Sequence, residues 1–488
     1  TLTLLTDWPL SKPNRDLNGD QKAAIVGGVR RHVISSANRK FQWRRVMVPG
    51  GLLWLAERDE TFRGTYSMST RTKYVADKLI AEPMLEDAEV RKQLGRLGFA
   101  EGEHREKLIE LGKTVFAILQ KTQKPKAEEP AGNSKGKSTQ KAEDDEGGNA
   151  SETSGEAAEV ADQSVSDADD DRDRKSAIAA YGEREMADIR AVLKQHLTNA
   201  ASWDAVLGKG GGKGKAKGAH GAANLPNLLR EDDKMQALWS LSRLERLGID
   251  GALFGTMVTQ GDYRIAAPSA VQVSHSITVH RAFDFETLEI AKDDLEDGPE
   301  AAMMLDASYA SGLYATSVTI DHCQLIENVL KPQVRDGKGK WVERIRPKHW
   351  HEAEDRDREL AAKLARALVI SILYASDHAM KTQTNARVYP SYVLAETSAK
   401  GGLNLLGAFS QPVNERRTNS ILSTAIERLR THTCAFDEAY GMTDKRAELI
   451  VSPYAEPEKD PRWQPQRPGN AGALANWVRD RVAETRPG

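Results

Sequence analysis

The sequence predicts a mixed α+β fold. Two segments, 271–279 and 311–321, alternate apolar and polar residues at every second position, which is the pattern of half-buried strands. Two others, 103–120 and 352–375, repeat apolar residues at helical spacing. This mixture of strands and amphipathic helices is typical of the α+β class, although a helix over 271–279 remains open.

The beginning of the chain combines a strand, a polar turn and a basic segment. A strand candidate at 1–5 ends before Pro9, and a polar turn follows at 13–16. A Gly-Gly pair then precedes a short basic run at 29–34, which has extended character. We therefore expect a charged loop that leads into an extended basic strand.

A helix is predicted from about residue 37 to residue 46. Ser35 and Ser36 precede it, and serine is a favoured N-cap because its hydroxyl oxygen accepts from a free backbone N–H group. Lys40 and Arg44 are four residues apart and share one face of this helix, whereas Phe41 lies on a neighbouring face. Without further context, this pair would be an ordinary solvated helix face.

The remaining elements follow from the same patterns. An acidic stretch at 284–306 separates the strand candidates 271–279 and 311–321, which predicts a protruding hairpin. A further strand is predicted at 387–396. Further helices are predicted at 72–97, 183–206, 232–247, 322–330, 419–431 and 471–481.

The segment 125–223 differs in composition from the rest of the chain. Much of the acidic excess lies between Glu128 and Asp173, in a polar tract that cannot bury enough apolar surface to fold alone. A Gly/Lys tract at 208–221 is flexible and basic. We therefore interpret 125–223 as a largely disordered or flexible insertion that carries one helical segment at 183–206.

Composition also limits the class of protein. A chain of 488 residues can build a large core, so its fold needs no disulfide or structural metal. Its two cysteines, Cys323 and Cys434, lack zinc-ligand spacing and suit a reducing cytosol. The longest apolar run, 367–375, is far shorter than the ~20 residues of a membrane helix. We therefore expect a cytoplasmic protein without a membrane partner.

The net charge does not exclude a nucleic-acid partner. Its formal value is −2, whereas phosphate binding normally requires an excess of Lys and Arg. The acidic excess is concentrated in the polar tract, so the rest of the chain is more basic than the average.

The segment 14–44 contains an NRD triplet, a QK pair, a GGxRR motif and an ISS helix cap in that order. This combination resembles the opening signature of the CasC-type family (Cas-seven superfamily), the crRNA-binding backbone subunits of type I-E-like CRISPR Cascade. Later blocks agree in order: IDGALFGTM, VQVSHSITVHRAFDF, YASGLYATSVTID, YPSYVLAETSAKGGLNLLGAFSQPV and LANWVRD. The resemblance covers most of the chain outside the insertion.

The resemblance implies a ferredoxin-like palm, similar to an RNA-recognition motif, with a helical subdomain and a protruding thumb hairpin. The implied divisions are 1–124 for the first part of the palm and a helical region, 125–223 for the insertion, 224–280 for the second part of the palm, 281–308 for the thumb hairpin, and 309–488 for the palm remainder and C-terminal helices.

The resemblance also implies a non-catalytic function without a cofactor. Such subunits polymerise along the guide RNA and present it for base pairing with target DNA in antiviral defence, so the implied partners are CRISPR guide RNA, the paired DNA strand, further copies of the chain and other Cascade subunits. In these proteins the thumb covers the RNA held by the neighbouring copy. The implied RNA-binding residues are Arg15, Lys22, Arg30, Arg31, Ser35, Ser36, Lys40, Arg44, Lys381 and Met257, the last as an apolar wedge beside a displaced base.

Physical chemistry agrees with this set of residues. Lys and Arg neutralise phosphates without reading sequence, as a protein that accepts any guide requires. Strand alternation points Arg30 and Arg31 to opposite faces, so one of them is expected to reach RNA. The sequence departs from the family at Ala37, where Gln is usual, and Arg39 or Arg45 could compensate electrostatically.

Two other functions remain open. A metal-dependent target-RNA endonuclease, as in other CRISPR types, would use Asp16, Asp293 or Asp294. A general single-strand binder would show no fixed register on a guide. The isolated histidines at 275 and 280 are expected to be satisfied or surface residues rather than ligands. His349, His351, Glu352 and Asp355 show no strong metal-ligand spacing. Without the resemblance, a methionine such as Met257 would be expected to pack in the core.

Overall fold

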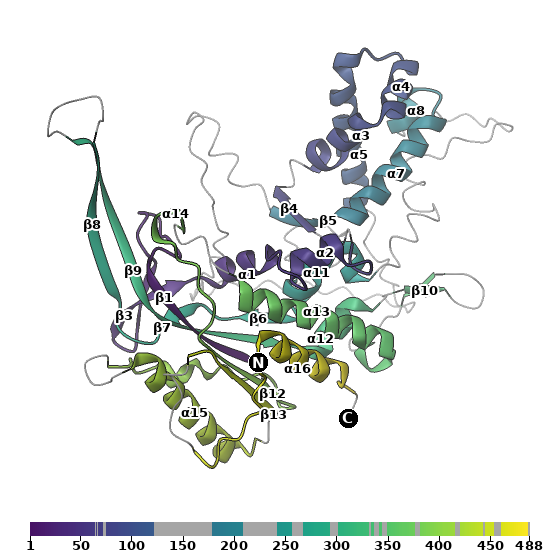
Figure 1. The fold of residues 1–488 in the computed structure, drawn as a ribbon. Helices are drawn as coiled ribbons and strands as arrows, with labels where there is room; N and C mark the ends of the chain where they lie inside the picture. Colours follow the sequence, from purple (N-terminus) through teal and green to yellow (C-terminus); the bar gives the residue numbers. More distant parts are fainter. Residues whose placement is uncertain are drawn as a thin grey trace, which may run out of the picture.

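The computed structural model contains a large sheet, helices that cover it, and a second group of helices (Figure 1). Helices and antiparallel strands are mixed, which confirms the α+β class. The residues described are 1–63, 65, 67–71, 75–121, 178–207, 242–255, 267–292, 301–330, 333–335, 341–343, 349–375, 381–414, 420–442, 445–452 and 460–486.

An antiparallel sheet organises the fold. Its strands follow the order β13-β12-β1-β9-β7-β3-β2, and β6 and β8 also pair with β9. β1 pairs with β9 on one side and with β12 on the other, so distant parts of the chain meet at its centre. The strands are β1 (Leu2–Ser11), β2 (Ala23–Val26), β3 (Val29–Ile34), β6 (Val271–Val273), β7 (Ser276–Thr278), β8 (Phe283–Lys292), β9 (Ala301–Ile320), β12 (Tyr392–Thr397) and β13 (Lys445–Ile450).

β1 extends further than the pattern at 1–5 predicted. It continues to Ser11, because a register shift after Trp8 accommodates Pro9 within the strand. The chain therefore enters its first polar turn directly from the sheet.

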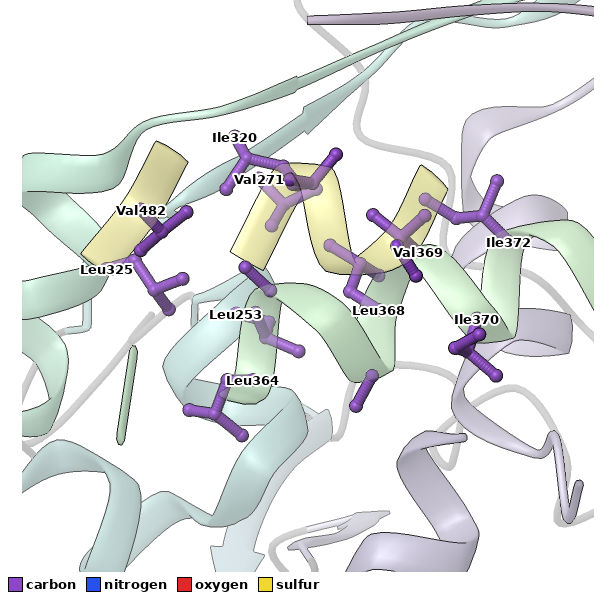
Figure 2. Close-up of a cluster of buried hydrophobic side chains, with 14 of the residues drawn as sticks. Leu253, Val271, Ile320, Leu325, Leu364, Leu368, Val369, Ile370, Ile372 and Val482 are labelled. Carbon is purple, nitrogen blue, oxygen red and sulfur yellow. The ribbon is translucent and has the colours of Figure 1, made fainter. Parts of the chain in front are cut away.

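One face of the sheet is covered by helices that build the main core. In Figure 2, Leu253, Val271, Leu325 and Leu368 converge in this core from α11, β6, α12 and α13. The helix predicted at 352–375 is α13, whose apolar run is buried here. The covering helices are α1 (Ser36–Arg44), α2 (Leu52–Arg58), α11 (Arg243–Phe254), α12 (His322–Val329), α13 (Asp355–Tyr374) and α16 (Ala471–Ala483).

The opposite face packs against α15 (Ile421–Tyr440) and the 3₁₀-helix η5 (Leu405–Phe409). Leu5 and Leu313 of the sheet share this second core with Ile426. The central strands are therefore buried on both faces, which accounts for their consecutive apolar residues.

β8 and β9 form a long hairpin that projects from the sheet (Figure 1). Its register runs from Phe283 opposite Ser311 to Lys292 opposite Ala301. A hairpin was expected here, but its arms differ from the expectation. The acidic stretch 284–306 itself supplies most of both arms, whereas 271–279 forms the short strands β6 and β7 within the sheet.

A second group of helices has its own core. Val115 of α5 and Leu193 of α7 are fully buried in it, so residues on both sides of 122–177 pack together. The predicted segment 183–206 is therefore ordered, because its apolar stripe packs against α5. The expected boundary between 1–124 and the insertion at 125–223 divides residues that share this core. The elements are β4 (Ser67–Arg71), η2 (Val75–Ala81), α3 (Glu82–Glu86), α4 (Ala88–Arg96), η3 (Glu101–Glu103), α5 (His104–Lys121), β5 (Ile178–Gly182), α7 (Glu183–Asn199) and α8 (Trp203–Leu207).

The single helix predicted at 72–97 is interrupted. Proline lies in the first turn of α3, and Asp87 caps α4 by accepting from the Glu89 backbone N–H at 2.9 Å. Both residue types favour helix starts, which explains the division.

Periodicity located the other long helices, although α15 continues to Tyr440, beyond the predicted end at 431. The sequence predictions missed short elements, among them β2, α2, β4, β5, η5 and β13. Of the helix predicted at 232–247, the part from residue 243 belongs to α11, Ser242 is its N-cap, and 232–241 lies outside the described residues. In the portion of the chain that the structure describes, no helix is long and apolar enough to cross a membrane. The remaining elements are β10 (Gln333–Arg335), β11 (Trp341–Glu343), η4 (His349–Glu352) and α14 (Lys381–Thr384).

Candidate nucleic-acid interface

The polar turn at 14–22 is tied to the start of α1. Asn14 Oδ1 accepts from the Ser35 backbone N–H at 2.8 Å, and the Asn14 N–H donates to Gln21 Oε1 at 3.1 Å. Gln21 in turn donates from Nε2 to the Val33 carbonyl at 3.0 Å. Asn14 and Gln21 of the NRD and QK motifs therefore brace the turn against β3 and α1.

This bracing presents basic side chains at the surface of the turn. Arg15 is exposed and forms an isolated backbone bridge with Gln21. Lys22 is half-buried, and its N–H donates to the Asn14 carbonyl at 2.8 Å. Lys12, which the motif comparison missed, lies between β1 and this turn and donates from Nζ to the Gly19 carbonyl at 2.9 Å. Its position in the sequence, just before the NRD triplet, could have identified Lys12 as a candidate residue of the site.

The two serines perform different tasks at the start of α1. Ser35 is the N-cap, and its Oγ accepts from the Asn38 N–H at 3.3 Å. Ser36 is the first helical residue, and its N–H donates to His275 Nδ1 at 3.1 Å. The predicted capping function is therefore present at Ser35. Both serine side chains are half-buried, and a contact of either hydroxyl group with RNA stays a prediction.

The glycine pair of the GGxRR motif forms the turn between β2 and β3. Gly27 and Gly28 have φ values of 63° and 77°, as a two-residue hairpin turn requires. A Cβ on Gly27 would lie 1.9 Å from the Ser410 carbonyl oxygen, whereas a Cβ on Gly28 would meet nothing within 4 Å. The first glycine is therefore required by close packing as well as by backbone conformation.

The structure decides between the two arginines of this motif. Arg30 is exposed and pairs with Asp284 at the base of the β8–β9 hairpin. Arg31 is fully buried and donates to the carbonyls of Thr278 at 3.2 Å and Ser410 at 3.3 Å. Burial, followed by repulsion from Arg428, lowers the pKa of Arg31. Arg31 therefore fastens β3 to its neighbours, and its assignment as an RNA contact is corrected.

His32 lies beneath the Arg30–Asp284 pair. Its ring is fully buried, and its Nε2 lies 2.7 Å from Asp284 Oδ1. Burial lowers the pKa of His32, although the hydrogen bond to Asp284 acts in the opposite direction. This cluster joins β3 to the hairpin.

Lys40 and Arg44 share one face of α1, as predicted, but this face lies against α11, and a contact of either residue with RNA stays a prediction. Lys40 Nζ lies 6.0 Å from the centroid of the Phe254 ring, and burial lowers the pKa of this lysine. Arg44 Nη2 lies 2.9 Å from Asp250 Oδ2, whose side chain is only 8% exposed. Much of the Arg44 charge is therefore balanced within the protein.

Several predicted residues lie at or beyond the limits of the described structure. Met257, Asp293 and Asp294 lie outside the described residues, and Lys381 begins α14 although its side chain is not described. His280 Nε2 accepts from the Leu313 N–H at 3.1 Å, as expected for a histidine with its polar atoms satisfied. Among the described residues, no group of three or more His, Cys, Asp or Glu could hold a metal ion.

Comparison with known proteins gives two kinds of match. A model of the family described as CT1975-like protein (Cas_CT1975) matches residues 1–473. No curated protein matches the sequence.

Solved structures match along nearly the whole chain. A chain from a "CRISPR RNA-guided surveillance complex, pre-nicking" has a TM-score of 0.59 at 16% identity, and the alignment covers 99% of both chains. A chain from a "CRISPR RNA-guided surveillance complex" has a TM-score of 0.50 at 14% identity, with 98% of both chains covered. At these identities the likeness establishes the fold.

Proposed function

Since the chain belongs to the CT1975-like protein family, a Cas-seven-type family, we propose that it is a crRNA-binding backbone subunit of a CRISPR surveillance complex. Full-length similarity to subunits of complexes described as CRISPR RNA-guided supports this proposal. In it, several copies polymerise along one guide RNA, present it to a target DNA strand, and contact other Cascade subunits in antiviral defence.

The junction of the 14–22 turn, β3 and α1 is the observation that carries the proposal. Hydrogen bonds from Asn14 and Gln21 hold these three elements together. The junction presents the exposed side chains of Arg15 and Arg30. Exposed guanidinium groups on a braced scaffold bind phosphates at a fixed spacing without selecting a base sequence, as a holder of variable guides must.

We assign the palm and thumb to particular elements within this proposal. The palm is a ferredoxin-like part of the sheet with α1, and the β8–β9 hairpin is the thumb. Phe285, Leu288 and Met304 of the hairpin are 48%, 49% and 61% exposed, so the hairpin offers apolar side chains that a neighbouring copy would cover. Met257 remains the proposed wedge and Lys381 a proposed phosphate contact.

The proposal assigns no catalysis. Asp16, the described candidate for an endonuclease, accepts from the Asn18 and Asp20 N–H groups at 2.9 Å and 3.0 Å through one carboxylate oxygen. These bonds favour a role in shaping the turn over metal ligation.

Assembly on RNA tests the proposal. The chain is mixed with a guide-length RNA and the masses of the complexes are measured by native mass spectrometry. We expect a ladder of complexes with increasing copy number, ending at a fixed number per RNA. Replacing 286–308 with a short Gly/Ser turn should abolish the ladder but preserve one-copy binding to a short RNA, because the thumb acts only between copies. Failure of the intact chain to bind RNA would reject the proposed function, and an unchanged ladder in the shortened variant would reject the thumb.

A further inference from the structure

The outer face of α1 carries an aromatic and basic pair. Arg45, directly after the helix, lies with its guanidinium carbon 4.2 Å from the centroid of the Phe41 ring. Arg45 is exposed and Phe41 is half-buried. Ala37, one turn before Phe41, is also exposed, so these residues form one outward stripe at helical spacing.

The other side chains of α1 are committed to the protein. Arg39, Gln42 and Trp43 are buried beneath the helix. Lys40 and Arg44 face α11 through Phe254 and Asp250. Within 36–45, the exposed positions are 37 and 45, so the stripe of residues 37, 41 and 45 is the side of α1 that is most open to a ligand.

Arg45 differs from its neighbour Arg44 in charge balance. Arg44 pairs with Asp250, whereas Arg45 pairs with no carboxylate among the described residues. The sequence of α1, SANRKFQWR, contains no acidic residue. A polyanion approaching this stripe therefore meets an uncompensated positive charge that is held on an aromatic ring.

A cation–π pair can also serve only to stabilise a helix, and α16 contains a pair of this kind. Arg481 lies 5.7 Å from the Trp477 ring at the same four-residue spacing, but its Nη2 pairs with Glu484 at 2.9 Å. The Arg481 side chain is only 19% exposed. The α1 pair is closer, exposed and without a described carboxylate partner, which favours a role in binding.

We propose that Phe41 and Arg45 form a stacking platform for a base of the guide RNA. This inference rests on the proposed function and adds a contact that Lys and Arg charge alone does not provide. The planar guanidinium, supported from below by the ring, offers its outer face to a nucleobase. Every base has a π-face, so stacking on this platform is compatible with any guide sequence. Ala37 adds no hydrogen-bonding group, so the stripe contributes stacking and charge.

Binding of matched normal and abasic RNA tests this platform. The probes are a short oligouridine and an abasic oligomer of equal length, with affinities measured by fluorescence anisotropy on the full chain. Arg45→Lys keeps the charge but removes the plane, and Phe41→Leu keeps an apolar side chain but removes the ring. Each variant should lose about fivefold or more in affinity for oligouridine, at the lower end of base-stacking effects, and little for the abasic oligomer. The preference of the intact chain for normal over abasic RNA should shrink accordingly.

Arg481→Lys is the matched control, and it should leave both affinities unchanged. If the intact chain binds RNA but Arg45→Lys binds both probes equally well, the platform is rejected while the proposed function stands. Normal short-RNA binding by Arg45→Lys together with fewer copies per guide would assign the pair to a contact between copies, which also overturns the platform. No RNA binding by the intact chain would reject the proposed function itself.

Discussion

Arginines on the two sides of the sheet are used in opposite ways. On the α15 side, Arg430 forms a bidentate pair with Glu448, and Arg446 pairs with Glu396 and Asp437. On the side of β3 and α1, Arg15 and Arg45 are exposed and pair with no described carboxylate. Carboxylates within the protein neutralise the arginines of the first group. The charges of the second group remain available to a binding partner.

The contrast predicts that stability and RNA binding can be separated by mutation. Arginines enclosed by carboxylates should control the free energy of unfolding and leave RNA affinity unchanged. Arginines on the open side should do the reverse. Arg44 is an intermediate case, because its pair with Asp250 lies on the RNA-facing helix.

The largest expected effect is on stability, from Glu448→Gln. Glu448 is buried and accepts from Arg430 at 2.6 Å and from the Tyr392 hydroxyl at 2.8 Å. Removing its charge leaves a buried guanidinium without compensation, so unfolding free energy should fall by about 3–5 kcal/mol. Denaturant titration measures the loss. Asp460→Asn, at an exposed surface pair with Arg462, should leave the unfolding free energy nearly unchanged, because solvent screens such pairs. Equal losses in the two variants would contradict the contrast between enclosed and exposed arginines.

A smaller loss is expected at the turn of the GGxRR motif. Gly28→Ala should cost about 1–2 kcal/mol from its positive φ alone. Gly27→Ala should cost more, because its new Cβ would collide with the Ser410 backbone carbonyl. Thermal unfolding of the two variants, side by side, measures the difference. A loss at Gly27 no greater than that at Gly28 would show that the turn does not depend on its contact with Ser410.

The smallest stability effect concerns pH and His32. Because burial lowers its pKa in the folded state, the unfolded chain takes up a proton first as pH falls. His32 therefore contributes stability above about pH 6.5, its ordinary pKa, and this contribution is lost as pH falls below that value, by at most about 1.4 kcal/mol per pH unit. Denaturant titrations between neutral and mildly acidic pH should show a shallower decline for His32→Gln. An identical decline would assign the pH dependence to other groups.

The sequence predicted much of the fold because hydrophobic periodicity is local. The helices at 352–375 and 471–481 each follow from residues within one segment. The protruding hairpin was expected from its flanking strands, and only its place in the chain was predicted correctly. The ordered state of 183–206 depends on α5, which lies on the far side of a long polar tract. Local composition alone therefore placed these residues in an insertion.

The candidate site was predictable in position but not in detail. The motifs correctly identified the polar turn, the basic strand after the Gly-Gly pair and the capped helix, but not the hairpin that β2 and β3 form around that pair. Alternation showed that Arg30 and Arg31 point apart, yet only the sheet order reveals that the side of Arg31 is covered by Thr278 and Ser410. Likewise, nothing near Arg44 in sequence indicates its pairing with Asp250. Partners that are distant in the sequence therefore determine which arginine side chains remain accessible to RNA.

The most direct measurement is the salt dependence of RNA binding by Arg15→Ala/Arg45→Ala, which removes the two exposed arginines that pair with no described carboxylate. Its matched control is Arg462→Ala/Arg479→Ala, which removes two arginines that pair with Asp460 and Asp480 at the protein surface. Affinity for a short single-stranded RNA is measured over a range of salt concentrations. If the charges of the two open-side arginines neutralise RNA phosphates, the slope of log affinity against log salt should fall by about 1.4, equally for unrelated sequences, while the control keeps the slope of the intact chain. An unchanged slope in the Arg15/Arg45 variant, or an equal fall in the control, would contradict the claim that the exposed arginines on this side of the sheet are available to RNA.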